Sequence, residues 1–184
     1  MNFISTPFPG LFLIEPKVFG DHRGYFFESF QQNEFDEKID KTVFVQDNES
    51  KSAKGVLRGL HFQKPPFTQA KLVRCITGKI LDVVVDLRKG SPTYKQSYSI
   101  ELNDSNKLQL FIPRGFAHGF VVLSEEAIFS YKVDNLYAPA HDAGIRFNDP
   151  ELMIDWQLPD AELKLSEKDR VLPLLSETDL AFDI

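Results

Sequence analysis

The segment Lys79-Ile-Leu-Asp-Val-Val-Val-Asp-Leu87 decides the fold class. One face of this segment carries four aliphatic side chains in strict alternation: Leu81, Val83, Val85 and Leu87. The other face carries two carboxylates and two aliphatic residues: Asp82, Asp86, Ile80 and Val84. A period of two predicts a β-strand. Turn sequences bound it on both sides, Thr77-Gly78 before it and Lys89-Gly-Ser-Pro92 after it.

Similar short strands, separated by turns, run along the rest of the chain. They are expected at Leu11–Val18, Tyr25–Phe30, Val43–Asn48, Gly55–Phe62, Lys71–Ile76, Lys79–Leu87, Gln96–Leu102, Leu108–Pro113, Ala117–Leu123 and Ala127–Asp134. About ten strands at this spacing favour an antiparallel sandwich or barrel over a parallel sheet with crossover helices. Helices are few. Ser29 is expected to cap a helix over Phe30–Ile39, and a second short helix is expected near Pro159–Leu163.

Length and composition limit the classes of protein to consider. A chain of 184 residues corresponds to one domain, which we expect to span residues 1–184. Hydrophobic residues make up 42% and charged residues 26%, which argues against a disordered chain and against a membrane protein. The net charge of −6 argues against a nucleic-acid partner. Residues 149–184 hold ten acidic and three basic residues, so the rest of the chain is nearly neutral and leaves room for an anion pocket.

Cysteine usage and the N-terminal segment bear on the cellular location. Cys75 is the single cysteine, so neither an intramolecular disulfide nor a cysteine zinc cluster can form, and a small core residue is expected there. No signal peptide precedes the strands, and no window approaches the length of a membrane helix. We therefore expect a cytoplasmic protein with no membrane partner.

Two histidines follow glycine-containing turns. Gly55-Val-Leu-Arg-Gly-Leu-His61 and Pro113-Arg-Gly-Phe-Ala-His118 resemble halves of the two short motifs of the cupin family, a jelly-roll barrel. Metal-binding cupins add a second His two residues after the first, and then a Glu. This chain has Gln63 there, and no acid in Lys64-Pro-Pro-Phe67. Two imidazoles alone rarely hold a divalent metal, so we expect no metal site.

A longer set of motifs narrows the resemblance. In order they are Asp21-His-Arg23-Gly24-Tyr-Phe-Phe-Glu28-Ser, Phe44-Val-Gln46-Asp47-Asn48, Leu57-Arg58-Gly-Leu-His61-Phe-Gln, Lys71-Leu-Val-Arg, Asp82-Val-Val-Val-Asp86-Leu-Arg, Ser91-Pro-Thr, Ile112-Pro-Arg-Gly-Phe-Ala-His118-Gly-Phe, Tyr131-Lys and Leu165-Ser-Glu-Lys168-Asp169. In this order and spacing they resemble the dTDP-4-dehydrorhamnose 3,5-epimerases, over residues 8–174. The resemblance implies a cofactor-free, metal-free jelly-roll enzyme that inverts carbons 3 and 5 of dTDP-4-dehydro-6-deoxy-D-glucose in dTDP-L-rhamnose synthesis.

The chemistry that the resemblance implies assigns four roles. A ketone at carbon 4 acidifies the protons on carbons 3 and 5, so inversion needs a base on one face, an acid on the other and a group that stabilises the enolate oxygen. His61 would be the base, Asp169 would orient it, and Tyr131 would be the acid. Lys71 would lie near the enolate oxygen. Strand parity supports Tyr131 independently, because it shares one face with Ala127, Phe129 and Val133.

The resemblance also implies a set of substrate-binding residues. They are Arg23, Phe26, Glu28, Gln46, Asp47, Asn48, Arg58, Lys71, His118, Tyr137, Asp142 and Lys168. Arg and Lys suit the diphosphate, and aromatic residues such as Phe26 and Tyr137 suit the thymine. Arg58 and His61 have opposite strand parity, so a bulge at Gly59 is needed to point both the same way.

The resemblance has departures and implies a partner. The family often has Glu at position 142, Trp at 111 and 147 and Gly at 70, where this chain has Asp142, Phe111, Phe147 and Ala70. The family forms homodimers that exchange N-terminal strands, so Arg23 and Glu28 are expected to serve the partner's pocket.

Three alternatives stay open at this point. One is an epimerase that inverts only carbon 3 or carbon 5, since such enzymes keep the same His, Asp and Tyr types. The second is a non-catalytic cupin that binds nucleotide sugars. The third is a metal-dependent cupin, which Gln63 opposes.

Overall fold

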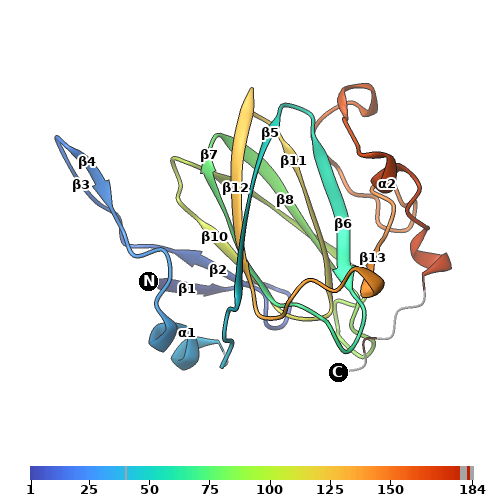
Figure 1. Ribbon diagram of the computed structural model, residues 1–184, viewed down its shortest axis with the longest axis horizontal. Coiled ribbons are helices and arrows are strands. Elements are labelled where there is room, and N and C mark those ends of the chain that lie inside the picture. Colours follow the sequence, from blue (N-terminus) through green and yellow to red (C-terminus); the bar gives the residue numbers. More distant parts are fainter. Residues whose placement is uncertain (40, 179–181, 183–184) are drawn as a thin grey trace.

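Two facing antiparallel sheets form the body of the protein (Figure 1). The computed structural model describes residues 1–39, 41–178 and 182. One sheet has the order β1 (Asn2–Ser5), β2 (Phe12–Glu15), β10 (Gln109–Ile112), β7 (Lys71–Thr77), β12 (Glu126–Val133), β5 (Gln46–Ala53). The other has the order β13 (Asp142–Gly144), β6 (Leu57–Gln63), β11 (Phe116–Val122), β8 (Lys79–Asp86), β9 (Ser97–Asn103). The predicted antiparallel jelly-roll class is confirmed.

Strand β8 shows how alternation builds the core. Leu81, Val83, Val85 and Leu87 face outward from the five-stranded sheet and are buried beneath the C-terminal segment, with Leu152, Trp156 and Leu163. Ile80 and Val84 face inward and pack against the opposite sheet. Asp82 and Asp86 are fully buried on the same inward face, where each must find polar partners. Arg88, Ser91 and Thr93 all donate hydrogen bonds to Asp86.

A third apolar cluster covers the outer face of the six-stranded sheet. Helix α1 (Gln32–Lys38) places Phe35 against Ile14, Leu72 and Phe111. The predicted cap was wrong: Gln31 caps this helix, its side chain accepting a hydrogen bond from Glu34 N at 2.7 Å. Ser29 instead lies before the helix, and its carbonyl accepts a bond from Gln109.

The N-terminal region differs from its predicted strands. In place of one strand over Tyr25–Phe30, a hairpin forms from β3 (Phe19–Asp21) and β4 (Gly24–Phe26). In Figure 1 this hairpin projects away from the two sheets. Strand β5 begins at Gln46, later than the predicted Val43, which is exposed. Short apolar runs in this region have the composition of strands. The local sequence does not show that their backbone lacks a neighbouring strand to pair with.

The C-terminal segment crosses the outside of the five-stranded sheet. Its described residues contain the short helices η2 (Asp160–Glu162), α2 (Glu167–Arg170) and η3 (Leu175–Glu177). A further single turn, η1 (Pro139–His141), precedes β13. The short helix predicted near Pro159–Leu163 is confirmed as η2. Strands β1, β3 and β13 and helix α2 were not predicted.

Candidate active site

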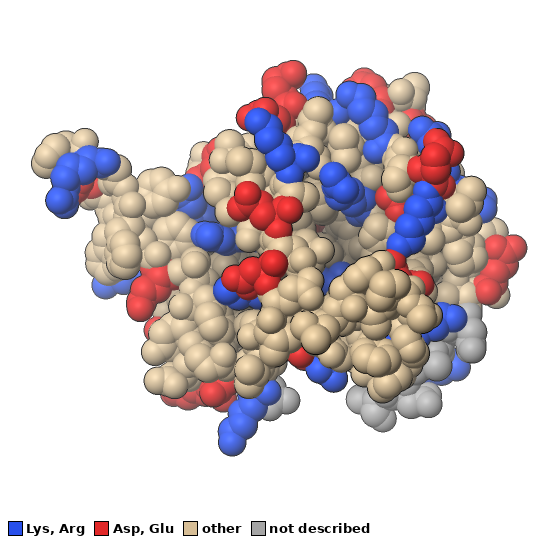
Figure 2. Space-filling view, viewed as in Figure 1, with Lys and Arg blue, Asp and Glu red and all other residues tan. Residues whose placement is uncertain are grey.

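A cavity of about 800 Å³ opens between the two sheets. Figure 2 shows the hollow, with basic and acidic side chains along its rim. Its lining brings together residues from β5, β6, β7, β11, β12 and α2. Those among the predicted site residues are Asp47, Asn48, Arg58, His61, Lys71, His118, Tyr131, Lys168 and Asp169. Side chains separated by more than a hundred positions thus share one cavity.

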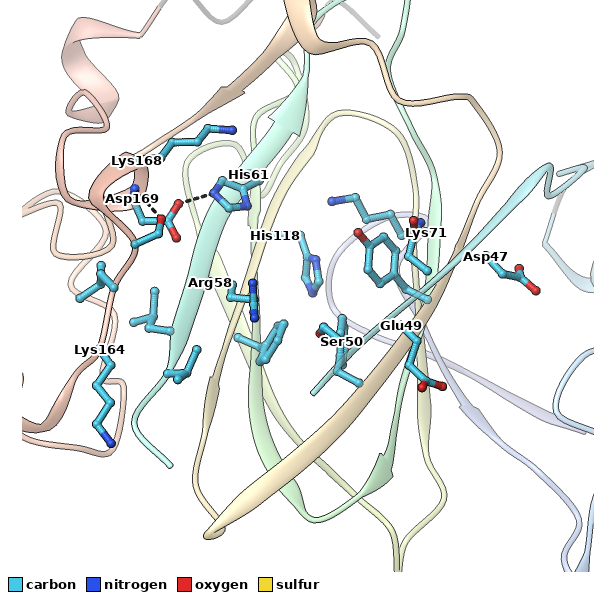
Figure 3. A pocket seen from close by; sticks show the side chains of 18 residues that line it. Asp47, Glu49, Ser50, Arg58, His61, Lys71, His118, Lys164, Lys168 and Asp169 are labelled. Carbon is cyan, nitrogen blue, oxygen red and sulfur yellow. Dashed lines mark hydrogen bonds and ion pairs between the residues drawn. The ribbon is translucent and has the colours of Figure 1, made fainter. Parts of the chain in front are cut away.

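His61 lies at the edge of the cavity and is paired with Asp169 (Figure 3). Its Nε2 lies 2.5 Å from Asp169 Oδ1; the His61 side chain is 31% exposed and that of Asp169 only 4%. Burial alone would raise the pKa of Asp169, but the hydrogen bonds from His61 and Ser166 outweigh it and lower that pKa. An ionised Asp169 accepts from Nε2–H, which leaves Nδ1 with its lone pair free. The arrangement suits a general base.

The C-terminal segment delivers Asp169 to His61. Leu57 N donates to Lys164 O at 3.0 Å, and Lys164 N donates to Gly55 O at 2.8 Å, forming a parallel bridge to the start of β6. Ser166 then caps α2, accepting from Asp169 N at 3.1 Å. Gly55 makes this approach possible. It has a φ of +81°, and a Cβ there would lie 2.3 Å from Glu162 O.

His118 forms a second pair, with Asp82, deeper in the same cavity. His118 Nε2 lies 2.9 Å from Asp82 Oδ2, and both side chains are almost fully buried. Burial lowers the pKa of His118 although Asp82 opposes the shift. A neutral His118 that donates from Nε2 presents Nδ1 to the cavity as a hydrogen-bond acceptor. Asp82 Oδ1 has no partner within the described residues.

Lys71 and Tyr131 come from the six-stranded sheet, opposite the two histidines. Burial lowers the pKa of Lys71 to about 8, against the attraction of Asp82 and Asp142. Burial also raises the pKa of the Tyr131 hydroxyl, so it stays protonated at neutral pH. The predicted parity is confirmed, since Ala127, Phe129 and Tyr131 belong to the inner cluster. A cation and a proton donor therefore face His61 across the cavity.

The predicted bulge at Gly59 is confirmed. Arg58 pairs with Phe120 and His61 with His118, so the register between β6 and β11 shifts between these pairs. The extra residue turns both Arg58 and His61 toward the cavity. Gly59 has a φ of +137°, and a Cβ there would lie 2.5 Å from Gly119 Cα. Only glycine fits this close approach.

A polar group borders the cavity beside α2. Asp142 Oδ2 accepts hydrogen bonds from the Tyr137 hydroxyl, at 3.0 Å, and from Lys168 Nζ. The bond to Asp142 raises the pKa of Lys168, which stays cationic, and that of Tyr137. Asp142 thus spans the gap to Lys168 despite its short side chain. Tyr137 and Asp142 themselves stand next to the cavity lining rather than in it.

The remaining predicted residues divide into two groups. Gln46 lies beside the cavity, and its Nε2 donates to Asn48 Oδ1 at 2.8 Å. The neighbouring Asp47 accepts a hydrogen bond from Lys132 Nζ. Arg23, Phe26 and Glu28 lie on or next to the projecting hairpin, exposed and outside this chain's cavity. Arg23 pairs with Asp21 on the same hairpin. Their role at a partner's pocket stays a prediction.

Several lining residues were not predicted as site residues. They are Glu49, Ser50, Val56, Leu57, Phe120, Phe129, Lys164, Leu165 and Ser166. Asp82 was also missed as the partner of His118, although an acid inside an apolar strand was a usable signal. Lys164 carries no such signal, because only the docking of the C-terminal segment brings it to the cavity.

Apart from Asp142, the departures from the family pattern lie away from the cavity. Ala70 and Phe111 belong to the cluster under α1, and Phe147 packs on the cluster beneath the C-terminal segment. Within the described residues no group of three or more His, Cys, Asp or Glu side chains could hold a metal ion. Among the helices of the same residues, none is long and apolar enough to cross a membrane.

Comparison with known proteins adds to this geometry. Residues 5–177 match the family model described as dTDP-4-dehydrorhamnose 3,5-epimerase. The enzyme of that name from Pseudomonas aeruginosa is 55% identical over 180 residues, 97% of this chain and 98% of that protein. The crystal structure of the Elizabethkingia anophelis epimerase has a TM-score of 0.92 and 51% identity, covering 96% of this chain and 97% of that one. A Legionella pneumophila epimerase in complex with dTDP-4-keto-L-rhamnose has a TM-score of 0.93 and 48% identity, covering 97% and 94%.

Proposed function

The chain belongs to the dTDP-4-dehydrorhamnose 3,5-epimerase family, and from this premise we propose how its residues carry out the reaction. The enzyme is an isomerase that converts dTDP-4-dehydro-6-deoxy-D-glucose into dTDP-4-dehydro-L-rhamnose, a step of dTDP-L-rhamnose biosynthesis. We assign the base to His61 and the acid to Tyr131. The observation that carries this assignment is their placement on facing sheets, with one cavity between them.

Inversion follows from that placement. His61 Nδ1 takes the proton from carbon 3 or carbon 5 on one face of the sugar, leaving an enolate. The Tyr131 hydroxyl returns a proton to the same carbon from the opposite face, which inverts that centre. His61 then releases its proton to solvent and Tyr131 regains one. Asp169 stabilises the imidazolium between these steps, because it stays ionised against His61.

Lys71 stabilises the enolate oxygen in this scheme. Its ammonium lies in a poorly solvated cavity, where a charge interacts more strongly than in water. The neutral His118 accepts a hydrogen bond from a sugar hydroxyl through Nδ1, held in orientation by Asp82. Proton transfer and charge stabilisation are therefore assigned to different side chains.

The nucleotide part of the substrate occupies the open end of the cavity. Arg58 and Lys168 are the cations placed to bind the diphosphate, and the exposed Tyr137 ring is placed to contact the thymine. Gln46, Asp47, Asn48 and Asp142 supply hydrogen bonds along this rim. We also propose that this protein is cytoplasmic. Residues 1–184 form a single domain in this proposal.

A second copy of the chain completes the site in this proposal. The β3–β4 hairpin exposes Phe19 and Phe26 at 54% and 66%, beside the charged Arg23, and it projects beyond the body of its own chain. Its base is anchored, because Lys107 contacts the Tyr25 ring and hydroxyl and Arg74 lies over Phe27. A fixed arm with exposed aromatic side chains and a charged turn at its tip suits insertion into a partner. Arg23, Phe26 and Glu28 then bind substrate held by the other subunit of a homodimer.

Isotope exchange tests the reaction and its two centres. The protein is incubated with the dTDP-4-keto sugar in heavy water, and carbons 3 and 5 are followed by NMR. Deuterium is expected at both carbons with the wild-type protein and at neither with His61→Ala. Exchange at one carbon alone would make the protein a single-centre epimerase. Binding without exchange would indicate a nucleotide-sugar-binding cupin, and exchange by His61→Ala at the wild-type rate would remove His61 as the base.

A further inference from the structure

Gln63 is a buried amide at the end of β6 that is not among the residues lining the cavity. It is 5% exposed, and its side chain makes three hydrogen bonds, all to backbone. Nε2 donates to Phe67 O at 2.7 Å and to Leu136 O at 3.2 Å, and Oε1 accepts from Ala138 N at 2.6 Å. Both hydrogens of the amide nitrogen are used. Burying an amide is costly unless it is bonded in this way.

Two of these three bonds lie on either side of a single residue. The carbonyl of Leu136 belongs to the peptide group before Tyr137, and the N–H of Ala138 belongs to the peptide group after it. Holding both groups fixes the backbone on each side of the Tyr137 Cα, and so fixes the direction of its Cα–Cβ bond, from which the ring extends. We infer that Gln63 is a positioning residue that sets the orientation of Tyr137 at the mouth of the active site.

Tyr137 depends on its backbone because little else holds it. Its side chain is 55% exposed, and among the described residues its hydroxyl donates a single hydrogen bond, to Asp142 Oδ2 at 3.0 Å. The same oxygen accepts from Lys168, which lines the cavity next to Asp169 (Figure 3). Asp142 also pairs with Gln63 across the β13–β6 ladder. A shift of Tyr137 is therefore passed to Lys168 through a shared carboxylate.

Other contacts hold the two neighbouring loops together without touching the peptide groups that flank Tyr137. Lys64 N donates to His141 O at 2.8 Å, and Gln69 Nε2 donates to Asn135 O at 2.7 Å. The rings of Phe67 and His141 pack at 4.6 Å between centroids. Loss of the Gln63 amide should leave these loops joined and release Tyr137 itself. The effect should then fall on nucleotide binding, and the proton-transfer residues on β6, β12 and α2 should be spared.

The test compares Gln63→Ala and the isosteric Gln63→Glu with wild type. A carboxylate at position 63 would face two carbonyl oxygens, so both variants lose the clamp. We measure KM and kcat for the dTDP-4-keto sugar, and the Kd of dTDP by calorimetry. The expected result is a rise of about tenfold in KM and Kd, with kcat within about threefold of wild type. On a Tyr137→Ala background, Gln63→Ala should change KM and Kd by less than about twofold.

The control is Asn106→Ala. Asn106 is also a side-chain amide that bonds three backbone groups, those of Glu101, Asn103 and Leu108, but in the turn after β9, where no residue lines the cavity. It should lower the thermal midpoint and leave KM and Kd unchanged. A purely structural Gln63 would behave as Asn106 does, which would overturn the inference, as would equal effects of Gln63→Ala in both backgrounds.

The inference rests on the proposed function through the role given to Tyr137, and the two can fail separately. If the wild-type protein binds dTDP but exchanges no protons, the catalytic proposal fails and the calorimetric comparison still tests Gln63. If the wild-type protein epimerises the sugar and Gln63→Ala keeps the wild-type Kd, only the inference fails. A wild-type protein that binds no dTDP overturns both.

Discussion

Two His–Asp pairs lie in the same cavity and differ in how each is built. His61 and His118 are direct neighbours across strands β6 and β11. His118 takes its aspartate from the adjacent strand β8, so this pair is part of one sheet. His61 takes its aspartate from α2, 108 residues further along the chain. The first pair forms with the sheet, whereas the second forms only when the C-terminal segment docks.

The two pairs also differ in solvation, and this difference separates their roles. The His118 pair is nearly dry, and burial lowers the pKa of His118, which favours the neutral form that we propose as a fixed acceptor. The His61 side chain is 31% exposed and lies beside an ionised carboxylate, so solvent reaches it, as proton exchange by the proposed base requires. A general base needs this exchange with solvent. Similar residue pairs thus acquire different chemistry from burial.

Replacing each histidine is the strongest test of the difference between the two pairs. His61→Ala should lower the epimerisation rate by about 10³-fold or more, since it removes the proton acceptor. His118→Ala should cost only about tenfold, as expected for one lost hydrogen bond. Rates of deuterium uptake at carbons 3 and 5 measure both. Equal losses in the two variants would show that the pairs share the proton transfer.

Changing each aspartate to asparagine should have the next largest effect. An amide can donate to Nε2 and so reverse the tautomer of the histidine. With Asp169→Asn, Nδ1 of His61 would carry a hydrogen and could not accept one, so kcat should fall by about 10²-fold or more. With Asp82→Asn, His118 would become a donor, which should raise KM more than it lowers kcat. Steady-state kinetics separate the two, and a kcat loss in both variants would contradict the assignment.

The docking of the C-terminal segment can be disturbed without touching either pair. In Gly55→Ala the new Cβ meets Glu162 O, so the segment must shift and Asp169 with it. We expect a fall of about tenfold in kcat, because small misplacements of a catalytic group weaken it strongly. The control is Gly90→Ala, a glycine of similar φ with open space around it. Equal rates for the two variants would mean that the segment does not position Asp169.

Lys71 provides an effect that depends on pH. Its pKa of about 8 in the folded protein is below the ordinary 10.5, so the folded state binds fewer protons between these values. Stability relative to Lys71→Met should therefore increase from pH 8 to pH 10.5, by up to about 3 kcal/mol. Urea unfolding of both proteins across this window measures the difference. A pH-independent difference would contradict the lowered pKa of Lys71.

The same titration should limit catalysis at alkaline pH. As Lys71 loses its charge above pH 8, the enolate loses its cation and kcat should fall. Lys71→Arg keeps the positive charge, so the fall of kcat above pH 8 should disappear in this variant. The bulkier side chain can change the value of kcat itself. The pH profile of kcat for the two proteins is the measurement, and an unchanged limb would assign it to another group.

Sequence reasoning succeeded where a local rule connects residues to directions. The alternation in Lys79–Leu87 placed the right side chains on each face of β8, and parity placed Tyr131 inside. The mismatch between Arg58 and His61 required a bulge at Gly59, which the β6–β11 register contains. The predictions for Ser29 and for Tyr25–Phe30 were wrong. The structure at these residues depends on which other groups the backbone bonds with, and no local pattern identifies those groups.

By itself, the sequence determined the antiparallel class, which side chains of Lys79–Leu87 share a face, the inward direction of Tyr131 and, through its motifs, the family and the reaction. The period of two is a local property of the backbone, so it can be read without knowing the contacts. Only the tertiary structure decided that Asp82 serves His118, that Gln63 clamps the backbone beside Tyr137 and that Lys164 borders the cavity. These depend on which distant segments pack together and on how much water remains between them, and burial on that scale sets both hydrogen-bond partners and pKa values.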